Sequence, residues 1–235
     1  GLISTWTLNW QRGVVLLKES WPLMLASISY ILYMRIDQIM IGIMLDQYSL
    51  GLYSASMRVF EAFIFVPVVI AASLFPYLVN THKKDWQLFK KQYSKATDIM
   101  TLFSYILIVF IGLFGGKLVG IAYGKAYTGV YDILLLQSIG LIFMFNAGLR
   151  SMYINITSNQ KIILITTAFS FLFNIILNYI LIPLYGINGA VLTTVLTQML
   201  SLFISNLFFK PTRTIFFIQI RSLLLLSYFE KIFKR

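Results

Sequence analysis

Long apolar segments separated by short polar links make up most of this 235-residue sequence. A membrane-spanning helix needs about 20 consecutive apolar residues. Six segments approach or exceed that length, and each is bounded by charged, glycine or proline residues. The pattern therefore predicts six transmembrane helices. They cover residues 22–45, 51–78, 97–111 with a glycine-rich extension to 116, 131–153, 162–182 and 190–209.

The two ends of the chain differ from this apolar middle. Residues 1–20 are mixed in polarity and rich in tryptophan, which favours the membrane interface, so they predict a juxtamembrane segment. Residues 21–210 form the predicted six-helix transmembrane bundle. Residues 211–235 form a basic amphipathic cytoplasmic tail, and their interrupted apolar pattern favours an interfacial helix over a seventh span.

Composition supports an all-α integral membrane protein. Hydrophobic residues make up 59% of the chain and charged residues only 11%, whereas soluble domains carry roughly 25% charged residues. The net charge of +11 would suggest nucleic acid in a soluble protein. Here the bases follow the positive-inside rule, because only Lys117 and Lys125 fall on one predicted side of the membrane. We therefore predict that both ends are cytoplasmic, and we expect no nucleic-acid partner.

Several kinds of chemistry find no support in the sequence. The chain has no cysteine, which excludes disulfides and thiolate metal sites. The single histidine, His82, lies in the basic residues 80–95, predicted to be the water-exposed connection between two spans. No phosphate-binding glycine loop, HExxH motif or Ser-His-Asp order is present. We expect no enzyme activity, no metal and no cofactor.

Four charges lie inside the first two apolar runs. Folding these runs as a hairpin about a turn at residues 46–49 brings Arg35 level with Glu61, and Asp37 level with Arg58. An unpaired charge in hydrocarbon costs at least ~2.5–3.5 kcal/mol. Two interpretations remain open: structural ion pairs that lock the hairpin, or arginines that bind an anionic substrate while an acid takes up a proton or a sodium ion.

Other polar residues occur deep in the later spans. Arg150 lies near the cytoplasmic end of its span, where the side chain is expected to snorkel to the headgroups; the alternative is a phosphate-binding role. Asn174 and Asn178 are spaced i, i+4 on one helix face. This spacing is more typical of hydrogen bonding between helices than of a solute site.

Two blocks of sequence resemble a known family. Asp37-Gln-Ile-Met-Ile-Gly, Gly51-Leu-Tyr-Ser-Ala-Ser-Met-Arg-Val-Phe-Glu61 and Ser73-Leu-Phe-Pro76 are similar to the first hairpin of the C-terminal half of polysaccharide (O-antigen type) flippases. Asn174-Ile-Ile-Leu-Asn178, Leu181-Ile-Pro183 and Gly186-Ile-Asn-Gly189 extend the resemblance. These flippases belong to the multidrug/oligosaccharidyl-lipid/polysaccharide exporter superfamily.

The resemblance implies a membrane carrier with two six-helix bundles around a central cavity. This chain matches the second bundle and begins with Gly1, so we expect a fragment that lacks the N-terminal six-helix bundle. The implied activity is flipping of undecaprenyl-pyrophosphate-linked oligosaccharide across the bacterial inner membrane, for O-antigen, capsule or lipopolysaccharide biosynthesis. Arg35, Arg58 and Arg150 are the candidate substrate-binding residues, and Asp37 and Glu61 the candidate ion-coupling or ion-pairing residues.

Partners and alternatives follow from the same resemblance. The expected partners are the lipid-linked oligosaccharide, the lipid bilayer, the missing bundle, and a polysaccharide polymerase with its chain-length machinery. One alternative function is a drug/cation antiporter of the same superfamily, although three intramembrane arginines favour an anionic substrate. A non-transporting membrane assembly subunit is the other.

Overall fold

The computed structural model of the chain describes residues 10, 13, 35–124, 127 and 129–224. It divides the chain into two compact units, Gly1–Ile36 and Asp37–Arg235. The predicted juxtamembrane segment, most of the first predicted span and the last part of the tail lie outside the described residues. The second unit holds the described fold, and its described elements are all helices.

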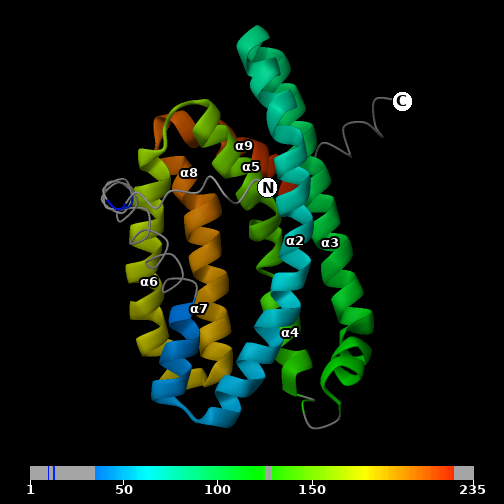
Figure 1. The fold of residues 1–235 in the computed structure, drawn as a ribbon, viewed down its shortest axis with the longest axis vertical. Coiled ribbons are helices and arrows are strands. Elements are labelled where there is room, and N and C mark those ends of the chain that lie inside the picture. Colours follow the sequence, from blue (N-terminus) through cyan, green and yellow to red (C-terminus); the bar gives the residue numbers. More distant parts are fainter. Residues whose placement is uncertain (1–9, 11–12, 14–34, 125–126, 128, 225–235) are drawn as a thin grey trace. The chain divides into compact units, whose positions relative to one another are not determined.

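Residues 37–44 are helical, and eight labelled α-helices follow them in the second unit (Figure 1). A π-helical turn, Leu200–Ile204, joins α7 to α8, and a 3-10 turn, Lys210–Thr212, precedes α9. In Figure 1 α2 runs beside α3 and α6 runs beside α7, while α4 packs against α2, α3 and α7. The α-helices are α2 (Gln47–Lys84), α3 (Trp86–Tyr123), α4 (Gly129–Ser138), α5 (Leu141–Ile156), α6 (Lys161–Tyr185), α7 (Ile187–Met199), α8 (Ser205–Phe208) and α9 (Arg213–Leu223).

Several of these helices are long and apolar enough to cross a membrane. The described residues contain 4 such helices: α2, α3, α6, and the continuous Ile187–Phe208 segment that contains α7 and α8. The α4–α5 pair, bent by 46°, makes a fifth span if it is counted as one. The prediction of an all-helical, multi-pass membrane protein is confirmed. The predicted number of six remains a prediction, because most of the first span lies outside the described residues.

The basic residues 80–95, predicted to be the connection between two spans, are helical except for Asp85 and are not an irregular loop. Both α2 and α3 contain 38 residues. A helix of that length measures about 57 Å, nearly twice the ~30 Å hydrocarbon core. Only Asp85 separates the two helices, and its carboxylate caps α3 by accepting hydrogen bonds from the backbone N–H groups of Gln87 and Leu88, at 2.7 and 3.2 Å. The basic residues therefore lie on a helical hairpin that extends beyond the hydrocarbon.

The turn between α6 and α7 depends on two glycines. Gly186 ends α6 with a φ of 59°, a left-handed conformation that favours glycine. At Gly189 a Cβ atom would collide with the backbone carbonyl of Leu181. The prediction of a tight turn is confirmed, and these glycines bring the end of α6 and the start of α7 into backbone contact.

Apolar and polar side chains are distributed as in a membrane protein. Many large apolar side chains are exposed on the outer faces of the helices, for example Leu113 on α3 and Leu164 on α6. Polar pairs lie inside the bundle: the Ser56 hydroxyl donates to the Gln137 side-chain carbonyl at 2.6 Å. Such pairs join helices where the surrounding lipid cannot hydrogen-bond to them.

Candidate functional site

The start of α2 sets the register of the first hairpin. The Asp46 carboxylate accepts hydrogen bonds from the backbone N–H and the hydroxyl of Ser49, at 2.8 and 3.1 Å. These bonds, the backbone one first, hold the pKa of the exposed Asp46 carboxyl below its usual value. Asp46 is therefore the N-cap, and α2 begins at Gln47.

The carboxylate of Asp37 is the point where three parts of the bundle meet. One oxygen accepts hydrogen bonds from the Tyr53 hydroxyl at 3.0 Å and the Thr194 hydroxyl at 2.7 Å. The other oxygen accepts from the side-chain amide of Asn178 at 2.6 Å, and the same amide nitrogen donates to the side-chain carbonyl of Asn174 at 2.9 Å. These five residues form what we name the Asp37 cluster, and its other members lie on α2, α6 and α7.

The Asp37 cluster is buried in the membrane-spanning part of the unit. Asp37 is 8% exposed, and Tyr53 and Asn178 are completely buried. Asp37 precedes the hairpin turn at Asp46 by nine positions, which places it about 13 Å along the helix from that turn. The side-chain oxygen of Asn178 has no hydrogen-bond partner. The cluster thus combines a buried carboxylate, neutral hydroxyls and amides, and one unsatisfied acceptor oxygen.

The predicted pairing of Asp37 with Arg58 is wrong. We expected a turn at residues 46–49, but Asp46 caps α2 and the residues after it are already helical. This shortens the turn, so Asp37 comes level with Tyr53 instead of a residue more than one helical turn further along α2. Arg58 is exposed on α2.

Arg150 lies inside the bundle, so the expectation that it snorkels to the headgroups is wrong. The side chain is 3% exposed. Its Nε donates to the Asn206 side-chain carbonyl at 2.8 Å, and one terminal nitrogen donates to the hydroxyls of Thr166 and Ser205, both at 3.3 Å. These acceptors lie on α6 and α8, so the guanidinium joins α5 to both helices.

Comparison with known proteins adds a family to this geometry. The family model described as polysaccharide biosynthesis protein matches residues 3–132, which is more than half of the chain. The chain belongs to this family. The resemblance to polysaccharide flippases is thereby confirmed at the level of the family.

Relatives of this chain occur in archaea and in bacteria. An uncharacterized membrane protein of Methanocaldococcus jannaschii is 30% identical over 195 residues, covering 82% of this chain and 45% of the relative. The probable flippase AglR of Haloferax volcanii is 25% identical, covering 72% of this chain and 36% of its own length. The capsular polysaccharide biosynthesis protein CapF of Staphylococcus aureus is 25% identical, covering 86% and 52%. No solved structure gave a significant match.

This chain spans about half or less of the length of these relatives. Arg58 lies eleven residues after the start of α2, about 17 Å along a helix that is long and apolar enough to cross a membrane. Arg35 belongs to the first unit, and its pairing with Glu61 stays a prediction.

The sequence pattern did not identify several residues that contact Asp37 or Arg150. Tyr53 and Thr194 complete the Asp37 cluster, and Thr166, Ser205 and Asn206 surround Arg150. One signal was available for Thr194. It follows Gly186 by eight residues, just as Asn178 precedes it by eight, so an antiparallel α6–α7 pair places both at one depth. Among the Arg150 acceptors, Asn206 is an amide inside an apolar segment, which is a signal of the same kind, whereas Thr166 and Ser205 look like ordinary positions in a span.

Proposed function

We propose that this chain forms one part of a flippase that moves a lipid-linked oligosaccharide from the cytoplasmic to the outer leaflet of the cell membrane. Family membership and the multi-pass fold support this proposal. A relative named a probable flippase supports the activity, and another named for capsular polysaccharide biosynthesis supports a glycan substrate. We further propose a polyprenyl pyrophosphate carrier, undecaprenyl in a bacterial cell, and a surface polysaccharide such as O-antigen or capsule as the destination.

The Asp37 cluster is the observation that carries the mechanism. Hydrogen bonds to an ionised carboxylate are shorter and roughly twice as strong as neutral ones. Three such bonds, from Tyr53, Thr194 and Asn178, hold residue 37 against α2, α6 and α7. A proton or a sodium ion on Asp37 would neutralise the charge and weaken all three bonds together. Cation binding and helix packing are therefore coupled at this one carboxylate.

The donor set of the cluster suits a small hard cation. Carboxylate, hydroxyl and amide oxygens are the ligands that such ions prefer. The Asn178 oxygen has no partner in the present arrangement, and a rotation of its amide would turn that oxygen toward Asp37. In the proposed cycle, ion binding at the cluster changes the contact of residue 37 with α6 and α7 and so favours one state of the carrier.

We assign Arg58 to the substrate. It is exposed on the surface of this unit, on a helix long and apolar enough to cross a membrane, where contact of its charge with lipid would be costly. We propose that this face of α2 lines a hydrated cavity and that Arg58 attracts the pyrophosphate of the carrier lipid. A second helical bundle would form the opposite wall of the cavity. The cytoplasmic position of both ends, and cooperation with a polymerase and chain-length proteins, are further predictions.

Replacement of Asp37 in the full-length protein tests this function. Asp37→Asn keeps the size of the side chain but removes the charge, so we expect surface polysaccharide to fall at least tenfold at normal protein levels. Asp132→Asn, an exposed carboxylate on α4, is the matched control and should stay near wild type. Normal polysaccharide in the Asp37→Asn strain would refute the coupling role. Export of a cationic dye instead of the glycan would favour a drug antiporter.

A further inference from the structure

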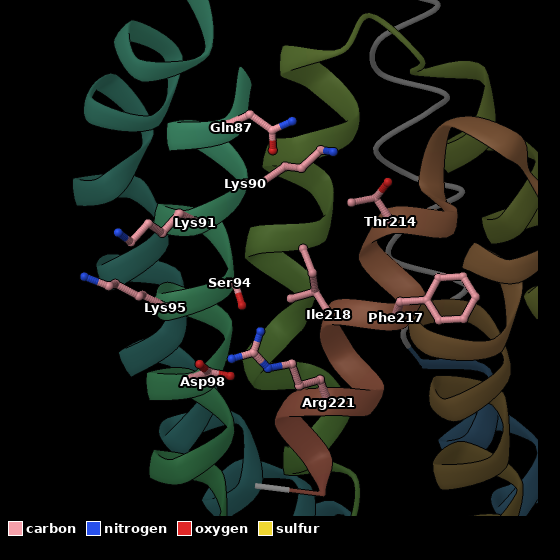
Figure 2. Close-up of a pocket in the computed structure, with 10 residues that line it drawn as sticks. All are labelled: Gln87, Lys90, Lys91, Ser94, Lys95, Asp98, Thr214, Phe217, Ile218 and Arg221. Atoms are coloured by element: carbon pink, nitrogen blue, oxygen red, sulfur yellow. The ribbon is translucent and has the colours of Figure 1, made fainter. Parts of the chain in front are cut away.

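A basic pocket lies between α3 and α9, and its lining includes no residue of the Asp37 cluster. Its volume is about 640 Å³, which is within the usual range for small-molecule sites. The cations that line it are Lys90, Lys91 and Lys95 of α3 and Arg221 of α9. Figure 2 shows Lys91 and Lys95 directed to one side of α3, Lys90 directed toward α9, and the Arg221 guanidinium reaching from α9 toward α3. The charge predicts an anionic ligand.

A buried carboxylate at the end of the pocket adds a second requirement. Asp98 is 9% exposed, and one of its carboxylate oxygens has no hydrogen-bond partner. Figure 2 places the guanidinium of Arg221 on the Asp98 side of the pocket, pointing toward that carboxylate. An unsatisfied buried acceptor is costly. A ligand that brings a hydroxyl or ammonium group beside its phosphate would satisfy this oxygen.

The pocket also has an apolar side. Phe217 is 62% exposed and lines it together with Ile218. Lys90 lies over the ring of Trp86, with its nitrogen 5.2 Å from the ring centroid. Tryptophan at this position is typical of the membrane–water interface. Exposed apolar side chains do not bind a freely soluble phosphate, whereas they can pack against the glycerol and acyl chains of a lipid.

The depth of the pocket matches a lipid headgroup. About 20 residues of α3 are needed to cross ~30 Å of hydrocarbon. If this stretch ends near residue 116, it begins close to Thr97, which marks the other boundary of the hydrocarbon. Asp98 then lies at that boundary, and Lys91 lies about 9 Å further out, within the headgroup layer. The bases on this end of the bundle also suit the anionic cytoplasmic leaflet.

We propose that this pocket binds the headgroup of an anionic glycerophospholipid, with the phosphate on Lys91 and Lys95 and a headgroup hydroxyl on Asp98, because these three residues share one face of α3. The lipid would join α9 to α3, where the Tyr105 hydroxyl already donates to the Leu223 carbonyl at 2.8 Å. α9 would thus be fixed by both protein and lipid. The inference concerns lipid binding alone and stands independently of the proposed flippase function.

Lipid titration of the purified full-length protein tests the site. Native mass spectrometry would count bound phosphatidylglycerol, with phosphatidylcholine of the same acyl chains as the neutral comparison. We expect Lys91→Gln/Lys95→Gln to weaken phosphatidylglycerol binding at least fivefold. Lys83→Gln/Lys84→Gln removes the same charge from the same helical hairpin outside the pocket, and it should change binding less than twofold.

Two further arms separate the possible ligands. Millimolar inorganic phosphate and glycerol phosphate should not displace the lipid; displacement by either would show a site for soluble phosphates and overturn the proposal. Equal losses in both lysine variants would show a diffuse surface charge and would also overturn it. Asp98→Asn should narrow the preference for phosphatidylglycerol over phosphatidic acid, because only the former has headgroup hydroxyls for the carboxylate oxygen. An unchanged preference would remove Asp98 from the site.

Discussion

The side-chain amide of Asn178 donates to the Asp37 carboxylate at 2.6 Å, although the two residues are separated by 141 positions in the sequence. This bond fastens the helix before α2 to α6, and Thr194 fastens the same carboxylate to α7. A single carboxylate therefore joins three helices of the bundle. Protonation of Asp37, or binding of an ion to it, is expected to weaken its hydrogen bonds to all of these helices.

Tyr53→Phe should weaken the Asp37 cluster without disturbing the surrounding packing. The substitution removes one hydrogen bond to a carboxylate and leaves the completely buried ring in place. A bond to a charged group contributes about 1.5–3 kcal/mol. We expect a lower apparent melting temperature of the detergent-purified protein. Tyr48→Phe, on an exposed side chain near the hairpin turn, serves as the control; an equal loss in both variants would contradict this account.

Arg150→Lys should destabilise the protein although the charge is kept. The Arg150 guanidinium donates to three acceptors on two helices, and lysine has no planar fork with which to reach them all. Each acceptor left unsatisfied costs about 1–3 kcal/mol. Thermal unfolding measures the effect. Arg213→Lys, at an exposed arginine that donates to the Leu207 carbonyl, should change stability little.

Gly189→Ala should disrupt the contact between α6 and α7. The new methyl group would overlap the carbonyl of Leu181, which is backbone and cannot move aside cheaply. We expect low yield of folded protein in size-exclusion chromatography. At Gly120, on an exposed face of α3, a Cβ would meet nothing within 4 Å. Gly120→Ala should therefore be neutral or stabilising by about 0.5–1 kcal/mol, since alanine is the better helix former.

Asp46 predicts a pH dependence of the first hairpin. Its pKa is lowered in the folded protein by the hydrogen bonds from Ser49. A lowered carboxyl pKa contributes stability that is present above the unfolded value of about 3.9 and is lost as the pH falls through the folded value. Asparagine caps a helix without titrating. The stability difference between wild type and Asp46→Asn should be constant from neutral pH to about pH 5 and shrink in more acidic solution. A difference that stays constant into acid would exclude the ionised cap.

Part of the candidate site was readable from the sequence. Asp37, Asn178 and Arg150 stand out because charged and amide side chains are rare inside apolar segments. Apart from the shared depth of Asn178 and Thr194, the contacts that these residues make were not readable from the sequence. Arg58 was an obvious partner for Asp37 by charge, but the length of a turn decides which residues come level, and Asp46 shortened that turn by capping α2. A change of one helical turn in register replaces every cross-helix neighbour.

The sequence alone determined the class of the protein, the approximate positions of its later helices and the turn at Gly186, because these depend on the local length of apolar runs and on the backbone freedom of single residues. Tertiary structure alone decided that Asp37 meets Asn178 and Thr194, that Arg150 is buried among neutral acceptors, and that α9 closes a basic pocket on α3. These contacts join residues far apart in the chain. They depend on how helices of unequal length pack side by side, and no local pattern records that packing.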